Sequence, residues 1–423
     1  MADDGPMAHT LDLSKLLSIA EDTPPVDSID VVADELRRSI GGRHVSLLIT
    51  NFSGTGLVRV SHVGATADED DGRHRTEAVL LAGSVYESAM FSQTPGVVAA
   101  SGGWMVLAPI TERGDAIGLL EVSLQREPDD ATVAHVAAAA HALAYLLIAS
   151  RRHTDVYEWA QRDVAFSLAA EVQRRLLPSA YTVEGGHFTL AGWLEPAHRV
   201  GGDTFDYCVD REYLYASMTD AMGHGVAAAL LATLVVGSLR NSRRGGATPS
   251  EQADAANEAM LESAGSDQFV TGQLLRISLA DGGVEFVNAG HPSPYLVRDD
   301  AASEVVINDP QLPFGIVDRA YKTQTAQLRP GDRLVLVTDG YLERNAVRLD
   351  LSELLATSVD RHPREVVREL AGKVLAATEG NLLDDATILC IDWYGEPTRR
   401  DATNGADAAR ATGPAGGNVP EPS

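Results

Sequence analysis

Along the chain, segments with the apolar pattern of β-strands alternate with segments with the apolar spacing of helices, and these segments group into two folded regions. Between residues 11 and 127, short apolar runs such as HVSLLIT and WMVLAPI alternate with segments of helical spacing such as SIDVVADELRRSI. This alternation predicts a compact α+β domain. From residue 179 to 395, LYASMTD and RLVLVTD have the composition of buried strands, and a hairpin is expected to turn at Asp281-Gly282-Gly283. A second α+β domain is therefore expected there.

The segment between these regions, residues 129–178, is predicted to be a long linker helix or two abutting helices. It contains no glycine or proline before Pro178, and Asp129 and Asp130 suit a helix start. Five of its apolar residues are spaced by three and four positions, as in a coiled-coil seam. These are Val133, Val136, Ala140, Leu143 and Leu147. Either the seam joins two chains into a homodimer, or the helix packs on its own domain.

Composition narrows the classes of partner and the location. With 34 Lys and Arg against 60 Asp and Glu, the net charge of −26 argues against nucleic acid or an anionic membrane surface as the main partner. Two cysteines, Cys208 and Cys390, cannot form a disulfide framework, which favours a reduced, cytoplasmic protein. The N-terminus lacks signal-peptide features, and we expect no membrane span. Residues 396–423 are rich in Ala, Gly, Pro and charge, which predicts a disordered tail.

Aspartates recur where apolar strands begin or end, which is the main chemical signal in the sequence. They are Asp203 in VGGD, Asp220 in TDAMGHG, Asp339 in VTDG, and Asp384 with Asp385 in LLDDAT. Each one alone fits an ordinary turn. Together, without His or Cys ligands, they fit a site for hard cations such as Mg²⁺ or Mn²⁺. Two such ions about 3.5–4 Å apart activate water for attack on a phosphoryl group, so that no protein nucleophile is needed.

Six motifs in order, VGGD, TDAMGHG, VNAGHPSPYLV, LPFGI, GDRLVLVTDG and DDAT, span residues 169–391. Their order resembles the SpoIIE/RsbU-type branch of metal-dependent serine/threonine protein phosphatases. The resemblance implies a central β-sandwich with helices outside and two Mn²⁺ or Mg²⁺ ions at one end. It assigns the metal ligands to four carboxylates and one carbonyl. These are Asp203, Asp220, Asp339 and Asp384, and the carbonyl of Gly223.

Several neighbouring residues keep more than one interpretation. Asp206 and Asp385 are either further ligands or structural groups, and for Asp385 the alternative is a strand-start cap. His224 is expected to cap the following helix rather than to act as a general acid. His291 is expected to support a rigid loop. The family usually has a Phe-Gly after TDG, and this chain lacks it while keeping Glu343.

The remaining resemblances concern regulation. Residues 11–127 resemble a GAF sensor domain, with DAIGLLEVSL as its closing strand. EVQRRLLPSAY resembles the segment where this branch attaches a regulatory helix, so Leu176 and Leu177 would pack on the catalytic core before Pro178. The expected function is a regulated phosphatase acting on a phosphorylated anti-sigma-factor antagonist of the STAS type, within a partner-switching pathway. The alternative is a non-catalytic module that senses a ligand and binds such partners.

Overall fold

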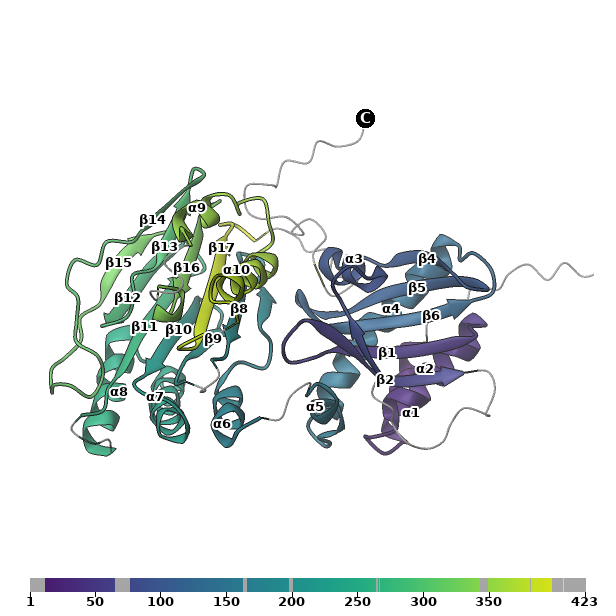
Figure 1. Ribbon diagram of the computed structural model, residues 1–423, viewed down its shortest axis with the longest axis horizontal. Coiled ribbons are helices and arrows are strands. Elements are labelled where there is room, and N and C mark those ends of the chain that lie inside the picture. Colours follow the sequence, from purple (N-terminus) through teal and green to yellow (C-terminus); the bar gives the residue numbers. More distant parts are fainter. Residues whose placement is uncertain are drawn as a thin grey trace, which may run out of the picture. The chain divides into compact units, whose positions relative to one another are not determined.

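The computed structural model describes most of the chain as two compact units. The described residues are 12–64, 77–162, 166–197, 201–263, 265, 267–342, 349–380, 382–397 and 406. Among the described residues, the first unit comprises those within Met1–Ala165 together with Ala406, and the second comprises those within Phe166–Arg399 (Figure 1). The predicted disordered tail and Glu343 fall almost wholly outside the described residues.

The first unit is a six-stranded antiparallel sheet with helices on both faces. Its strand order is β3-β2-β1-β6-β5-β4. The elements are α1 (Leu13–Glu21), α2 (Ser28–Ile40), β1 (His44–Thr50), β2 (Gly56–Gly64), β3 (Glu77–Leu80), α3 (Val85–Ser92), β4 (Gly96–Ala100), β5 (Gly103–Glu112), β6 (Asp115–Leu124), α4 (Asp130–Ser150) and α5 (Val156–Ala160). The predicted α+β character is present, and the GAF resemblance remains a prediction.

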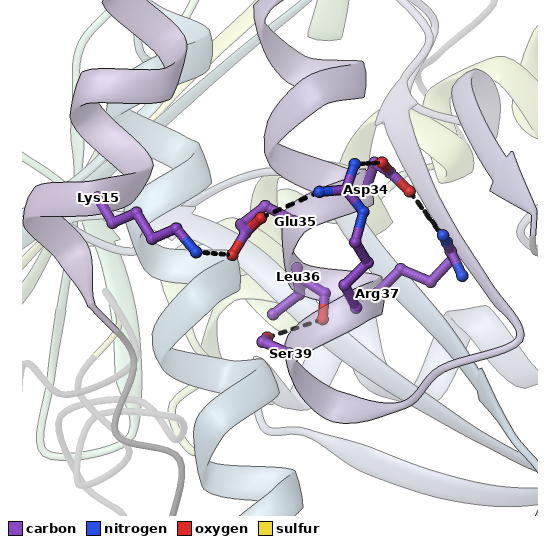
Figure 2. Close-up of polar contacts among 7 residues, drawn as sticks. Lys15, Asp34, Glu35, Leu36, Arg37 and Ser39 are labelled. Atoms are coloured by element: carbon purple, nitrogen blue, oxygen red, sulfur yellow. Dashed lines mark hydrogen bonds and ion pairs between the residues drawn. The ribbon is translucent and has the colours of Figure 1, made fainter.

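Polar contacts hold the two N-terminal helices of this unit together. Lys15 on α1 pairs with Glu35 on α2, and within α2 the guanidinium of Arg37 donates to Asp34 at 2.8 Å (Figure 2). Asp12 caps α1 by accepting a hydrogen bond from the backbone of Lys15 at 3.0 Å. The polar side chains of α2 thus pair with neighbours on α1 and α2, while its apolar side faces the sheet.

Helix α4 is part of the core of the first unit. Its buried side chains Val136, Leu143 and Leu147 share one cluster with strand residues of β1, β5 and β6 and with residues of α2. The opposite face of the sheet carries a smaller cluster, which includes Met90 of α3. Four of the five predicted seam positions are therefore buried within their own domain. The alternative that this helix packs on its own domain is correct, and the coiled-coil interpretation is wrong.

The expected linker over residues 129–178, one long helix or two abutting helices, is also not found, because the described residues of that range form three helices. Helix α4 ends at Ser150, α5 covers Val156–Ala160, and α6 covers Leu168–Leu176. The first two belong to the first unit and the third belongs to the second. The sequence contains good helix formers throughout, but Thr154 and Asp155 lie in a non-helical break.

One helix of the described chain, α4, has the length and hydropathy of a membrane span, which the sequence analysis did not expect. Half of its most apolar window is buried inside the protein. Length and composition alone do not distinguish a membrane span from the core helix of a folded domain. Because α4 packs in the core of the first unit, it is a core helix of that unit.

The second unit consists of two antiparallel sheets with helices outside. The strand orders are β15-β12-β11-β10-β9 and β14-β13-β16-β17-β8-β7. The elements are α6 (Leu168–Leu176), β7 (Thr182–Glu184), β8 (Phe188–Glu195), β9 (Thr204–Val209), β10 (Tyr213–Ala221), α7 (Val226–Arg244), α8 (Pro249–Ser263), β11 (Val270–Ser278), β12 (Gly283–Ala289), β13 (Tyr295–Arg298), β14 (Ala301–Glu304), β15 (Gln324–Gln327), β16 (Arg333–Val337), η2 (Asp339–Tyr341), α9 (Leu351–Ala356), α10 (Pro363–Ala377) and β17 (Ala386–Trp393).

Two sheets with helices outside them form a sandwich (Figure 1), and three apolar clusters hold its layers together. Inward-facing residues such as Met218 and Leu389 fill the space between the sheets. Helices α7 and α8 cover the five-stranded sheet, and α9 and α10 cover the six-stranded sheet. The predicted β-sandwich with outer helices is confirmed, as is the hairpin between β11 and β12. Along each strand, side chains point alternately to the two faces of the sheet, so one set packs between the sheets and the other packs against the outer helices.

Candidate active site

Four strand termini meet at one end of the sandwich. Strand β9 begins beside the end of β10 in one sheet, and β17 begins beside the end of β16 in the other. The antiparallel pairing therefore brings predicted ligands from distant parts of the sequence to one place. They are Asp203, Asp220, Asp339 and Asp384.

Asp203 connects the two sheets at this end. Its Oδ2 accepts hydrogen bonds from the hydroxyls of Thr338, after β16, and Thr387, in β17, both at 2.7 Å. The side chain is only 1% exposed. Burial, followed by repulsion from Asp220 and Asp385, raises the pKa of Asp203 well above its usual value. The two hydroxyls fix the orientation of this carboxylate, but they are uncharged and do not neutralise it.

Asp220, Asp339 and Asp384 form the more open part of the site. Burial, with repulsion from Asp339 and Asp384, raises the pKa of Asp220 to about 7. Burial raises the pKa of Asp339 and of Asp384 as well. Within the described residues, none of the three carboxylates forms an ion pair with a lysine or arginine. Among the described residues, these three acidic groups thus repel one another with no lysine or arginine paired to them.

Glycines allow the chain to approach these carboxylates closely. A Cβ on Gly201 would lie 2.8 Å from Oδ1 of Asp384, and one on Gly340 would lie 2.1 Å from the Asp385 carbonyl oxygen. Gly223, the predicted carbonyl ligand, has a φ of +95°, and it is exposed in the turn that follows β10. Such a turn favours glycine, and the exposure of this residue is compatible with its predicted role as a carbonyl ligand.

Asp385 has a structural role that differs from that of its neighbour Asp384. Its Oδ1 accepts a hydrogen bond from the backbone of Ala197 at 2.8 Å, and its Oδ2 accepts from Gly201 at 3.0 Å and from the Gln173 amide at 2.5 Å. Both carboxylate oxygens of Asp385 therefore accept hydrogen bonds from the protein, and these bonds fix the segments that lead to Asp203. This geometry favours the positioning interpretation of Asp385, although its bonds extend beyond a strand-start cap.

Asp206 is also occupied by protein partners. Its carboxylate accepts hydrogen bonds from Arg240, at 2.9 and 3.1 Å, and from Arg243, at 2.9 Å. Arg240 also donates to the Leu176 carbonyl oxygen at the end of α6, at 2.5 Å. The group joins β9, α6 and α7. Its geometry favours the structural interpretation over that of a metal ligand.

The two histidines have different surroundings. His224 is exposed and acts electrostatically on Asp384, lowering the pKa of that carboxyl against the larger effect of burial. The expected helix cap is not made, because the N-cap residue of α7 is Gly225 and no side chain caps the helix there. His291 is buried, its Nδ1 lies 2.9 Å from the Thr271 hydroxyl, and burial lowers its pKa to about 3. Its position agrees with a supporting role in the loop.

Three residues of the site were not identified from the sequence: Thr338, Thr387 and Gln173. The two threonines lie inside the VTDG and DDAT motifs, so their proximity to the ligands was available as a signal. Gln173 lies in α6, and its amide donates to the Asp203 carbonyl oxygen at 2.9 Å as well as to Asp385. Its contacts depend on tertiary structure and leave no local pattern in the sequence.

The donor set fits hard divalent cations. It consists of carboxylate oxygens and an exposed carbonyl, without sulfur or imidazole, which is the chemistry of Mg²⁺ and Mn²⁺ sites. Among the described side chains, no three His, Cys, Asp or Glu residues form a preassembled ligand group for one ion. An ion of this kind keeps several waters and needs only one or two carboxylates. The uncompensated charge on Asp220, Asp339 and Asp384 is what such ions would neutralise.

Part of the second unit matches a known protein family. Residues 210–394 match the family described as Stage II sporulation protein E (SpoIIE). This part of the chain, less than half of its length, is similar to the SpoIIE family. The chain is 23% identical to phosphoserine phosphatase RsbU of Bacillus subtilis over 230 residues, 53% of this chain and 68% of RsbU. It is also 23% identical to phosphoserine phosphatase RsbP of the same organism, over 50% of this chain and about half (52%) of RsbP.

Similar solved structures include the RsbU and RsbW domains of Rv1364c from Mycobacterium tuberculosis. That structure is 25% identical to this chain with a TM-score of 0.46, and the match covers 56% of this chain and 65% of the other. A second is the phosphatase domain of SpoIIE from Bacillus subtilis with a fragment of its regulatory domain. It is 20% identical with a TM-score of 0.42, and the match covers 49% of this chain and 64% of the other.

Proposed function

We propose that this protein is a metal-dependent phosphatase that hydrolyses phosphoserine or phosphothreonine in a protein substrate. The observation that carries the proposal is the convergence of four strand-end aspartates, three of which form no ion pair with a lysine or arginine among the described residues. Asp203, Asp220, Asp339 and Asp384, with the Gly223 carbonyl, would hold two Mn²⁺ or Mg²⁺ ions. When bound, such ions supply an activated water and bind the phosphoryl oxygens.

The residues of the chain contribute position and charge to this reaction. The hydroxyls of Thr338 and Thr387 hold Asp203 in one orientation, so that a ligand at the centre of the site is fixed before substrate binds. Burial raises the pKa of the Cys390 thiol to about 12, which keeps it protonated and unreactive. Attack by water rather than by a cysteine therefore suits this site.

The substrate and pathway rest on the relatives. Their names describe RsbU and RsbP as phosphoserine phosphatases. By this likeness, we infer a phosphorylated anti-sigma-factor antagonist of the STAS type as the substrate, in a partner-switching pathway and in the cytoplasm. We further infer that the first unit is a GAF-like sensor for a small-molecule or protein signal. The net charge of −26 disfavours nucleic acid as a partner.

The test is hydrolysis of p-nitrophenyl phosphate by the full chain with and without Mn²⁺. We expect activity that EDTA abolishes and that falls by orders of magnitude in Asp220→Ala and Asp339→Ala, because a lost ligand misplaces the attacking water. Asp309→Ala is the matched control, since Asp309 is an exposed carboxylate paired with Lys322. Full activity in EDTA would contradict the proposal.

The alternative function, a non-catalytic module that binds partners, makes a different prediction. Such a module would bind a phosphorylated antagonist but release no phosphate with either metal. Circular dichroism of each variant shows whether the sandwich is folded, so that a loss of rate is assigned to the site. The uncompensated aspartates favour the catalytic function, because a binding module has no need for them.

A further inference from the structure

Exposed apolar side chains surround the carboxylates of the candidate active site. Met222 is two positions after Asp220 and is 41% exposed, and Leu383, directly before Asp384, is 72% exposed. Leu342, three positions after Asp339, is 44% exposed. Because consecutive Cα atoms are about 3.8 Å apart, each of these residues is held close to the ligand it follows or precedes.

The first turns of α7 extend this surface. Val226 at the start of the helix is 43% exposed, and Leu230, one turn later on the same side, is 59% exposed. The turn before α7 also carries His224, which acts electrostatically on Asp384. The start of α7 and the segment before β17 therefore lie at the same end of the sandwich. We call Met222, Val226, Leu230, Leu342 and Leu383 the apolar rim.

Leu230 and Leu383 are more than half exposed, so a polar residue at either position would cost little in stability. Grouped exposed apolar residues mark interaction surfaces. A small phosphate ester would reach the aspartates without touching the rim. A protein whose phosphorylated side chain enters the site brings its own surface against these residues.

Resting on the proposed function, we propose that the apolar rim is the docking surface for the phosphoprotein substrate. Its partner is a folded protein whose phosphoserine or phosphothreonine is set in an apolar surface that carries no acidic side chains. Asp220, Asp339 and Asp384 are acidic, and the whole chain has a net charge of −26, so an acidic surface around the phosphate would be repelled. The metal ligands would accept any phosphate ester, so apolar contacts at the rim would determine which phosphoprotein is bound.

The test compares three substrates with the full chain in Mn²⁺: p-nitrophenyl phosphate, a phosphorylated STAS-type antagonist, and a phosphoserine peptide cut from that antagonist. The variants are Val226→Ser, Leu383→Ser and the double variant. We expect kcat/KM for the protein substrate to fall about tenfold or more in the double variant, as for central residues of an interface. The ratio of protein to p-nitrophenyl phosphate turnover should fall with it.

Val306→Ser is the matched control, because Val306 is 75% exposed on the same unit and lies in the segment after β14. It should leave all three rates unchanged. Equal losses for all substrates in the rim variants, or no loss for the protein, would overturn the docking surface. So would a wild-type enzyme that cleaves the peptide as efficiently as the protein. A wild-type chain that hydrolyses none of the substrates would instead refute the proposed function.

Discussion

Uncompensated carboxylates make the metal-free site sensitive to pH. Burial, together with repulsion from Asp339 and Asp384, raises the pKa of Asp220 from 3.8 to about 7. Between these values the folded state binds a proton that the unfolded state releases, so stability is present at low pH and is lost as pH rises toward 7. Without metal, ionised Asp220 should therefore cost on the order of a few kcal/mol at pH 8.

We expect urea unfolding in EDTA to show a lower free energy of unfolding at pH 8 than at pH 5.5. Asp220→Asn should flatten this difference and stabilise the metal-free protein at pH 8, because the ionising group is gone. Added Mn²⁺ should stabilise the wild type more than the variant at pH 8. Parallel pH profiles for wild type and variant would show that Asp220 does not carry an elevated pKa.

The sequence identified which carboxylates gather at the site but not how each is used. Asp384 and Asp385 are adjacent, yet only Asp385 has both oxygens occupied, by Ala197, Gly201 and Gln173. The order of the motifs predicted the convergence, since it follows from the resemblance as a whole. Hydrogen bonds between segments far apart in the chain depend on the finished fold, and no local pattern encodes them.

At the scale of elements, α6 forms hydrogen bonds with residues of the candidate active site. Gln173 is 3% exposed and donates both to the Asp203 carbonyl and to Asp385. The end of α6 is held by Arg240, which donates to the Leu176 carbonyl oxygen. Leu176 packs in the core beneath α7 and α8, and Leu177 lies against the core between the sheets. The predicted leucine contacts with the catalytic core are therefore present, and Gln173 adds a polar connection.

Replacing Gln173 by Met should keep the volume of the side chain and remove both hydrogen bonds. We expect Mn²⁺ affinity to fall roughly 10- to 100-fold, as is typical when a group supporting a metal ligand is lost. Isothermal titration with Mn²⁺ measures this directly. Arg175→Gln is the control on the same helix, because the Arg175 side chain is 58% exposed and pairs with Glu171. Equal affinities in both variants would show that α6 has no influence on the site.

The helical region before α6 shows where local signals fail. Propensity and the absence of glycine and proline predicted one long helix or two abutting helices, and residues such as Val136 and Leu143 do form a regular apolar stripe. The same spacing suits a coiled coil and a helix packed on a sheet, so periodicity alone does not choose between them. Burial against the sheet of the first unit decided the outcome.

At the scale of the whole molecule, the described core divides at the boundary between the units. The clusters of the first unit contain residues 16–160, and those of the second contain residues 176–393. A domain with a complete core of its own folds independently. The boundary expected from the sequence, after residue 127, would instead separate α4 from the sheet on which it packs.

Two truncations test this division. Deleting residues 1–165 should leave a monodisperse, cooperatively unfolding phosphatase unit, because no residue of its core clusters is removed. Deleting residues 1–128 keeps α4 but removes the strands that cover Val136, Leu143 and Leu147, so this protein should self-associate through the exposed stripe. Light scattering coupled to size-exclusion chromatography separates the two outcomes, and circular dichroism reports whether the sandwich persists. If the shorter deletion is monomeric while the longer one aggregates, α4 belongs to the second unit in solution and the division is incorrect.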